Sequence, residues 1–82
     1  MSPTSLRFLE SKKLLAENLK KLRRSRGLAQ EKLALEAQVD RTVVSKIERQ
    51  IANPSLDILV RLAYVLDVTV CDILANSSEG ID

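Results

Sequence analysis

Four side chains between residues 41 and 46 combine positive charge with hydroxyl groups: Arg41, Thr42, Ser45 and Lys46. If residues 41–49 form a helix whose inward positions are Val44 and Ile47, these four side chains face solvent together. Basic side chains can pair with guanine O6 and N7 in the DNA major groove, and a threonine methyl can contact a thymine methyl. The pattern predicts a base-reading helix whose first residues lie nearest the base edges. A merely solvated helix face is the alternative.

The charge along the chain supports a polyanionic partner. Residues 1–49 hold 12 basic and six acidic residues, a net charge of +6, whereas residues 50–82 hold one basic and five acidic residues, a net charge of −4. A basic half of this kind is typical of proteins that bind nucleic acid or an anionic membrane. The whole-chain charge of +2 conceals this division.

Helices joined by short turns must position these side chains, because glycine and proline are scarce and apolar residues recur at three- and four-residue spacing. Expected helices begin after the N-cap candidates Ser11, Asp40, Ser55 and Thr69, and a further short helix covers 30–37. Gly27 is expected to end the first of them. The fourth helix has an expected apolar stripe at Leu56, Leu59, Leu62, Ala63 and Leu66.

These expectations define an all-α, compact five-helix bundle in which the second and third helices form a helix-turn-helix unit. Residues 11–75 make up the domain. Residues 1–10 are either an arm or an extension of the first helix, and residues 76–82 are an expected flexible tail.

The composition excludes several functions. The chain has no histidine and one cysteine, so zinc fingers, disulfide frameworks and catalytic triads are not expected, and neither is a cofactor or an enzymatic activity. Cys71 is expected to be a small, partly buried apolar residue. No apolar run approaches the roughly 20 residues that span a bilayer, and the first residues lack the features of a secretory signal. A cytoplasmic, nucleoid-associated protein is therefore expected.

The order of the motifs resembles the Cro/C1-type (xenobiotic-response-element) helix-turn-helix family. The matching segments are Leu19–Arg23, Gly27–Ala34, Val39–Arg49, Asn53–Leu56 and Val68–Leu74. The segment around Asp40–Arg49 is also similar to the controller proteins of restriction–modification systems. The resemblance implies a fold of the lambda-repressor-like DNA-binding type.

The resemblance implies further residue roles. Gln30 stands where the family holds a DNA phosphate and braces the recognition helix, while Arg23 and Glu48 stand where phage repressors of this family form a buried ion pair. The other phosphate candidates are Lys32, Asp40 and Arg49. Three departures affect the caps and turns. Ala29 replaces a capping serine or threonine, Gln38 replaces a glycine whose backbone often needs positive φ, and Gln50 replaces a common glycine after the third helix.

One domain of this size covers too little DNA for tight specific binding, so a homodimer on a palindromic operator is expected. The expected dimer surface is the acidic C-terminal part, with surplus apolar residues at Val65, Val68, Val70 and Leu74. The predicted function is sequence-specific transcriptional regulation on double-stranded DNA, either by blocking RNA polymerase or by recruiting it. The alternative is an antitoxin or protein-binding adaptor with the same fold.

Overall fold

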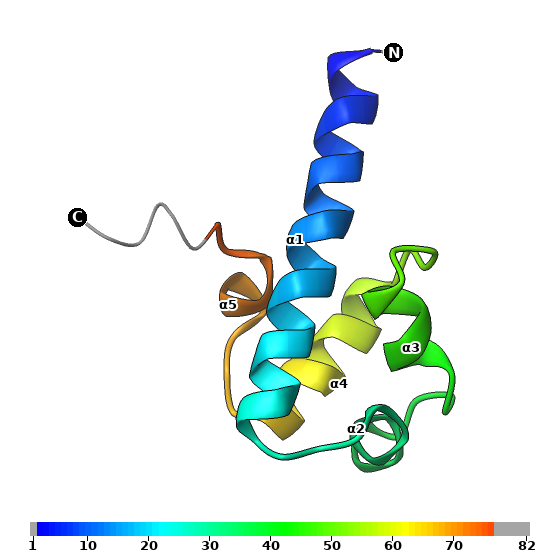
Figure 1. The fold of residues 1–82 in the computed structure, drawn as a ribbon, viewed down its shortest axis with the longest axis vertical. Helices are drawn as coiled ribbons and strands as arrows, with labels where there is room; N and C mark the ends of the chain where they lie inside the picture. The colour runs from blue at the N-terminus through cyan, green and yellow to red at the C-terminus, as the bar shows by residue number, and fades with distance from the viewer. Residues whose placement is uncertain (1, 77–82) are drawn as a thin grey trace, which may run out of the picture.

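The computed structural model describes residues 2–76, which form five helices and no strand (Figure 1). They are α1 (Pro3–Ser25), α2 (Gln30–Ala37), α3 (Val43–Glu48), α4 (Leu56–Leu66) and α5 (Val70–Leu74). The predicted all-α, five-helix architecture is confirmed. The expected tail, apart from Asn76, lies outside the described residues.

An aliphatic core holds the helices together, as the near absence of aromatic residues requires. Leu19, Leu33, Val44, Leu62 and Ile73 are each 0% exposed and come from five different helices. Helix α1 packs against α3 and α5, and α2 packs against α3 and α4. Burial of each such side chain stabilises the fold by about 1.5–3 kcal/mol, so this core is what fixes α3 against the rest of the molecule.

Helix α1 is longer than the sequence predicted. It begins at Pro3 behind Ser2, whose hydroxyl oxygen accepts a hydrogen bond from the Ser5 N–H. The expected N-cap at Ser11 is therefore wrong, and residues 3–10 extend α1 as a helix. Figure 1 shows this N-terminal half projecting beyond the other helices. No helix within residues 2–76 combines the length and the hydrophobicity that crossing a bilayer requires.

Helix α3 is shorter than predicted, because Arg41 and Thr42 belong to a turn that precedes it. Asp40 organises this turn: its Oδ1 accepts hydrogen bonds from the Thr42 N–H and from the Thr42 hydroxyl. Asp40 is thus not the N-cap of α3, and its carboxylate instead closes a local turn of the kind that aspartate favours. Val44 and Ile47 are buried, as expected.

The C-terminal helices have the predicted N-caps, but two of their residues are more exposed than predicted. The Ser55 side chain accepts a hydrogen bond from the Ile58 N–H, and Thr69 forms a capping box with Asp72. Leu56 is 67% exposed, so it does not belong to the inward stripe of α4. Cys71 is exposed as well, although partial burial was expected.

Asn18 fastens α5 to α1, a role that helical periodicity did not indicate. Its Nδ2 donates hydrogen bonds to the carbonyl oxygens of Ile73 (2.8 Å) and Ala75 (2.7 Å). These carbonyls lie at the end of α5, where a helix leaves acceptors unpaired. A five-residue helix is too short to persist alone, so this clamp and the buried Ile73 hold α5 in place.

Replacing Gln38 by glycine is expected to raise the free energy of unfolding by about 0.5–1 kcal/mol. Gln38 ends α2 with φ of 59°, a left-handed conformation that costs a residue with a Cβ more than it costs glycine. Chemical denaturation of the two proteins measures the difference. The matched control is Glu36→Gly, an exposed position inside α2, where glycine should instead lower the stability by about 1 kcal/mol.

Candidate nucleic-acid interface

A buried ion pair fixes the end of α3 to α1. Arg23 Nε lies 2.8 Å from Glu48 Oε2, and Arg23 Nη2 donates to Glu48 Oε1 at 3.0 Å, so the contact is bidentate. The third guanidinium nitrogen, Nη1, donates to the carbonyl oxygen of Leu28 at 2.7 Å. The two side chains are only 10% and 2% exposed. This is the pair that the family resemblance implied.

Gln30 joins the same cluster from α2. Its Nε2 donates to Glu48 Oε1 at 2.9 Å, so Glu48 on α3 receives hydrogen bonds from both α1 and α2. Burial by itself would raise the pKa of Glu48, but the hydrogen bonds from Arg23 and Gln30, with the charges of Arg23 and Lys20, outweigh it and lower the pKa. The carboxylate therefore stays ionised, and the three helices are connected through it.

The turn and α3 carry the predicted base-contacting residues. Arg41 and Lys46 are exposed, while Thr42 and Ser45 are half-buried. Val44 and Ile47 of α3 are in the core, and Lys46 of the same helix is exposed to solvent. The Thr42 hydroxyl proton is already donated to Asp40, which leaves its methyl group and its oxygen lone pairs for a ligand.

The carboxylate of Asp40, a predicted phosphate contact, accepts hydrogen bonds from Thr42. Hydrogen bonds from the Thr42 hydroxyl and the Thr42 N–H lower the pKa of Asp40, and the charges of Lys46 and Arg41 lower it further. An ionised carboxylate repels a phosphate, so the side chain itself is unsuited to bind one. Its observed role is to order the turn that carries Arg41 and Thr42.

The remaining phosphate candidates lie at the ends of the two helices. Lys32 is exposed in the first turn of α2, 3.6 Å from Glu36, and Arg49 is exposed at the end of α3. Ala29 gives α2 no side-chain cap within the described structure. The first N–H groups of α2 therefore remain available, and such groups favour anions.

The apolar residues of the expected dimer surface differ in their exposure. Val65, Val68 and Val70 are partly buried and pack against the core, whereas Leu74 is 40% exposed. The exposed apolar side chains of α4 are instead Leu56, Val60 and Tyr64, which follow one another at four-residue spacing and share one face. We call these three residues the α4 stripe.

The short helices α2 and α3, joined by a turn and fixed by a common core, define a helix-turn-helix protein. The exposed basic residues Arg41 and Lys46 lie on the turn and on the second of these helices. Residues 19–73 match the helix-turn-helix family, and this is more than half of the chain. The chain belongs to this family of DNA-binding transcriptional regulators, and its relatives place it among the Cro/C1-type proteins.

The similar proteins include restriction–modification controllers. Control protein C.SmaI of Serratia marcescens is 34% identical over 76 residues, which are 93% of this chain and 90% of that protein. The solved structure of the hypothetical transcription factor NHTF from Neisseria has a TM-score of 0.82 at 32% identity, covering 87% of this chain and 82% of that one. The restriction-modification controller C.AhdI from Aeromonas hydrophila has a TM-score of 0.72 at 34% identity, covering 76% and 94%.

Proposed function

We propose that this protein is a homodimeric regulator that binds a palindromic operator in double-stranded DNA. The observation that carries the proposal is the outward face of the turn and α3, where Arg41 and Lys46 are exposed beside Thr42 and Ser45. In the major groove these groups would read base edges. By occupying a promoter, the dimer would block RNA polymerase or recruit it.

Phosphate contacts would set the register of α3 in the groove. Lys32, Arg49 and the N-terminal N–H groups of α2 at Gln30 supply suitable donors on either side of the base-reading face. Gln30 would have two roles, because its amide nitrogen already braces Glu48. These contacts act on any sequence, so they add affinity and orientation, whereas the four base-contacting candidates supply specificity.

Selection of bound sequences from random duplex DNA tests the proposed function. A palindromic consensus is expected, with half-sites whose centres lie about 34 Å, or one helical turn, apart. Recovery of sequences without any shared half-site would contradict specific DNA reading.

Lys32→Ala is expected to weaken binding to all duplexes alike and to reduce the salt dependence by about one counterion per domain, because one phosphate contact is lost. Binding measured on operator and random DNA across a range of salt concentrations checks both expectations. Lys21→Ala is the matched control, since Lys21 lies on the side of α1 that meets Asp72 and Ala75 near α5. An unchanged salt slope for Lys32→Ala would remove Lys32 from the interface.

The homodimer is expected because a single domain of this type covers only about 600–1,000 Å² of DNA-contacting surface. Sedimentation at micromolar concentration should give twice the 9.2 kDa mass of the chain. The proposed dimer surface is the C-terminal pair of helices, with the α4 stripe and Leu74 as its exposed apolar residues. A purely monomeric profile would contradict this part of the proposal.

A further inference from the structure

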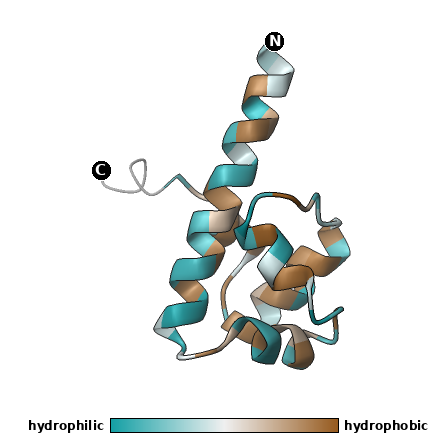
Figure 2. Ribbon diagram, turned by 45° about the vertical axis from the view of Figure 1, so that its right-hand side comes forward, coloured by the Kyte–Doolittle hydropathy of each residue, from teal (hydrophilic) through white to brown (hydrophobic). Residues whose placement is uncertain are grey.

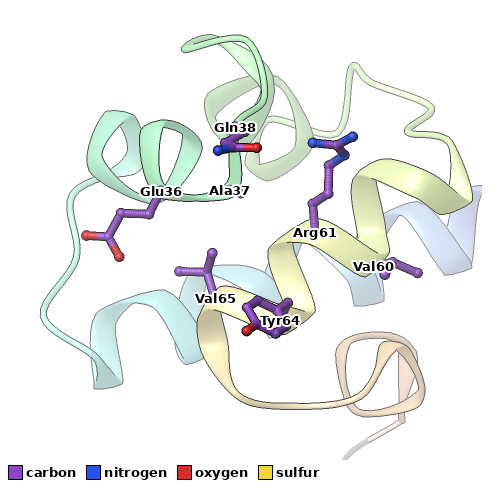
Figure 3. Close-up of a pocket in the computed structure, with 7 residues that line it drawn as sticks. All are labelled: Glu36, Ala37, Gln38, Val60, Arg61, Tyr64 and Val65. Carbon is purple, nitrogen blue, oxygen red and sulfur yellow. The ribbon is translucent and has the colours of Figure 1, made fainter.

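The segment that joins α2 to α3 is mostly hydrophilic (Figure 2). It runs from Gln38, which ends α2 (Figure 3), to Thr42. Val39 is its one apolar residue and packs against the core. Residues at the start of a recognition helix lie nearest the base edges, so this segment and α3 together form the base-reading face of the proposed complex.

Asp40 is an exposed carboxylate on this basic face. Between residues 38 and 49 the chain has two acidic residues, and the other, Glu48, has a side chain only 2% exposed and bound to Arg23. Hydrogen bonds from Thr42 lower the pKa of Asp40, so the carboxylate is ionised at neutral pH. Asparagine closes the same kind of turn without a charge. Turn geometry alone therefore does not account for an acidic residue that faces a polyanion.

The two oxygens of the Asp40 carboxylate have different surroundings. Oδ1 accepts hydrogen bonds from the Thr42 N–H, at 2.8 Å, and from the Thr42 hydroxyl. Among residues 2–76, no hydrogen bond or ion pair reaches Oδ2. The bonds to Oδ1 restrict the side chain before any ligand binds, which lowers the entropic cost of a contact made by Oδ2.

The chemistry of Oδ2 selects one kind of base. An ionised carboxylate only accepts hydrogen bonds. In the major groove the donors are the amino groups of cytosine and adenine, whereas guanine and thymine present acceptors. Adenine places its acceptor N7 beside the amino group, and cytosine presents N4 without a neighbouring acceptor. An ionised oxygen therefore favours cytosine, and its repulsion of acceptor groups disfavours guanine and thymine.

We propose that Asp40 Oδ2 reads one cytosine in each half-site by accepting a hydrogen bond from the N4 amino group of that base. The inference rests on the proposed binding of an operator by the turn and α3, and it specifies one base on that operator. The same carboxylate then has two roles, since Oδ1 orders the turn and Oδ2 contacts DNA. The exposed cations Arg41 and Lys46 offset its repulsion of the phosphates.

Asp40→Asn tests the contact in the protein. The amide oxygen of asparagine can keep both hydrogen bonds from Thr42, and an NH₂ group replaces Oδ2. The preference for cytosine at one operator position is expected to fall by about fivefold or more. Binding to random duplex DNA is expected to rise by about twofold, because a negative charge near the phosphates is removed. Binding to operators with single substituted base pairs, and to random DNA, measures both changes.

Asp72→Asn is the matched control for charge and for local geometry. Asp72 Oδ2 accepts a hydrogen bond from the Thr69 N–H at 2.8 Å, so this aspartate also pairs with a nearby threonine. It lies on α5, which packs against α1 and α4. The control makes the same change in net charge and should leave every base preference unaltered. Circular dichroism verifies that both variants stay helical.

A chemical change in the DNA tests the same contact without altering the protein. N4-methylcytosine still pairs with guanine, but a methyl group replaces the N–H that faces the major groove. At the position that the substituted operators locate, this base is expected to weaken binding of the unmodified chain by about fivefold or more. Binding of Asp40→Asn should change far less, because its hydrogen bond is already lost. N4-methylcytosine outside the half-sites should have no effect.

The outcomes separate this inference from the proposed function. If the unmodified chain selects no shared half-site, both fail. If it selects a consensus but Asp40→Asn keeps every base preference, Asp40 acts only on the turn or on the phosphates, and this inference alone is overturned. The same conclusion follows if the altered preference falls on a base pair without cytosine, or if N4-methylcytosine leaves binding of the unmodified chain unchanged.

Discussion

Replacing Glu48 by glutamine is expected to lower the free energy of unfolding by about 3–5 kcal/mol. The substitution keeps the size of the side chain but removes the charge that balances Arg23, whose side chain is only 10% exposed. It also replaces one of the two acceptor oxygens by an NH₂ group, which would face either Arg23 Nε or both Arg23 Nη2 and Gln30 Nε2. A small domain has about 5–15 kcal/mol in total, so the loss is a large share of its stability.

Urea denaturation of the purified proteins measures this effect. The matched control is Asp57→Asn, which breaks the exposed pair between Arg61 Nε and Asp57 Oδ2 at 3.0 Å. A pair in solvent contributes about 0–1 kcal/mol, so the control should change stability little. If both variants lost the same free energy of unfolding, burial would not make the Arg23–Glu48 pair more important for stability than an exposed pair.

The same pair predicts a pH dependence with a definite sign. Because the folded protein lowers the pKa of Glu48, the pair's contribution is fully present above the ordinary glutamate pKa of about 4.3 and is lost as the pH falls through the lowered folded value. Stability measured from pH 7 downward should therefore decline in acid less steeply for Glu48→Gln than for the unmodified chain. Asp40 and Asp72 also have lowered pKa values, so part of the acid dependence remains.

Arg41→Ala is expected to weaken binding to the operator by about 5- to 150-fold, which corresponds to about 1–3 kcal/mol, while binding to random DNA changes far less. Arg41 is exposed on the turn that Asp40 orders, so its replacement should leave the fold intact and delete the proposed base contact. The preference for one base pair in each half-site should relax. Equal losses on operator and random DNA would make Arg41 a phosphate contact instead.

Binding to a panel of operators, each with one substituted base pair, locates the contact. Lys32→Ala provides the contrast, because a phosphate contact lowers affinity for every member of the panel alike. Thermal unfolding confirms that Arg41→Ala remains folded. This comparison separates the two kinds of contact on residues that lie in different parts of the helix-turn-helix unit.

The helices were predictable wherever local chemistry determined them. Caps at Ser55 and Thr69 and the burial of Val44 and Ile47 follow from side-chain type and helical spacing, and each was predicted correctly. The start of α1 was not, because both Ser2 and Ser11 are suitable caps and the sequence contains no signal that excludes the longer helix. The predicted start of α3 was wrong because an aspartate such as Asp40 can either cap a helix or close a turn.

The contacts within the site could not be predicted from the spacing of residues along the sequence. Arg23, Gln30 and Glu48 come from three helices, and only the family resemblance brought them together before the structure did. The clamp from Asn18 to α5 joins residues 55 and 57 positions apart, which no periodic pattern can indicate. The exposed α4 stripe was partly missed because the apolar residues of α4 continue around two faces of the helix.

Helix α1 is a single rod of 23 residues, about 34 Å long at 1.5 Å per residue. Near one end of α1, Arg23 binds Glu48 of α3, and the other end of α1 projects from the rest of the molecule. In a helix of this length, a small change of tilt displaces the ends by a large distance. Tilting it by about three degrees about one end moves the other by about 2 Å, which is enough to shift a side chain from one hydrogen-bonding partner to the next. A partner that displaced the free end of α1 would therefore act on α3 through the Arg23–Glu48 pair.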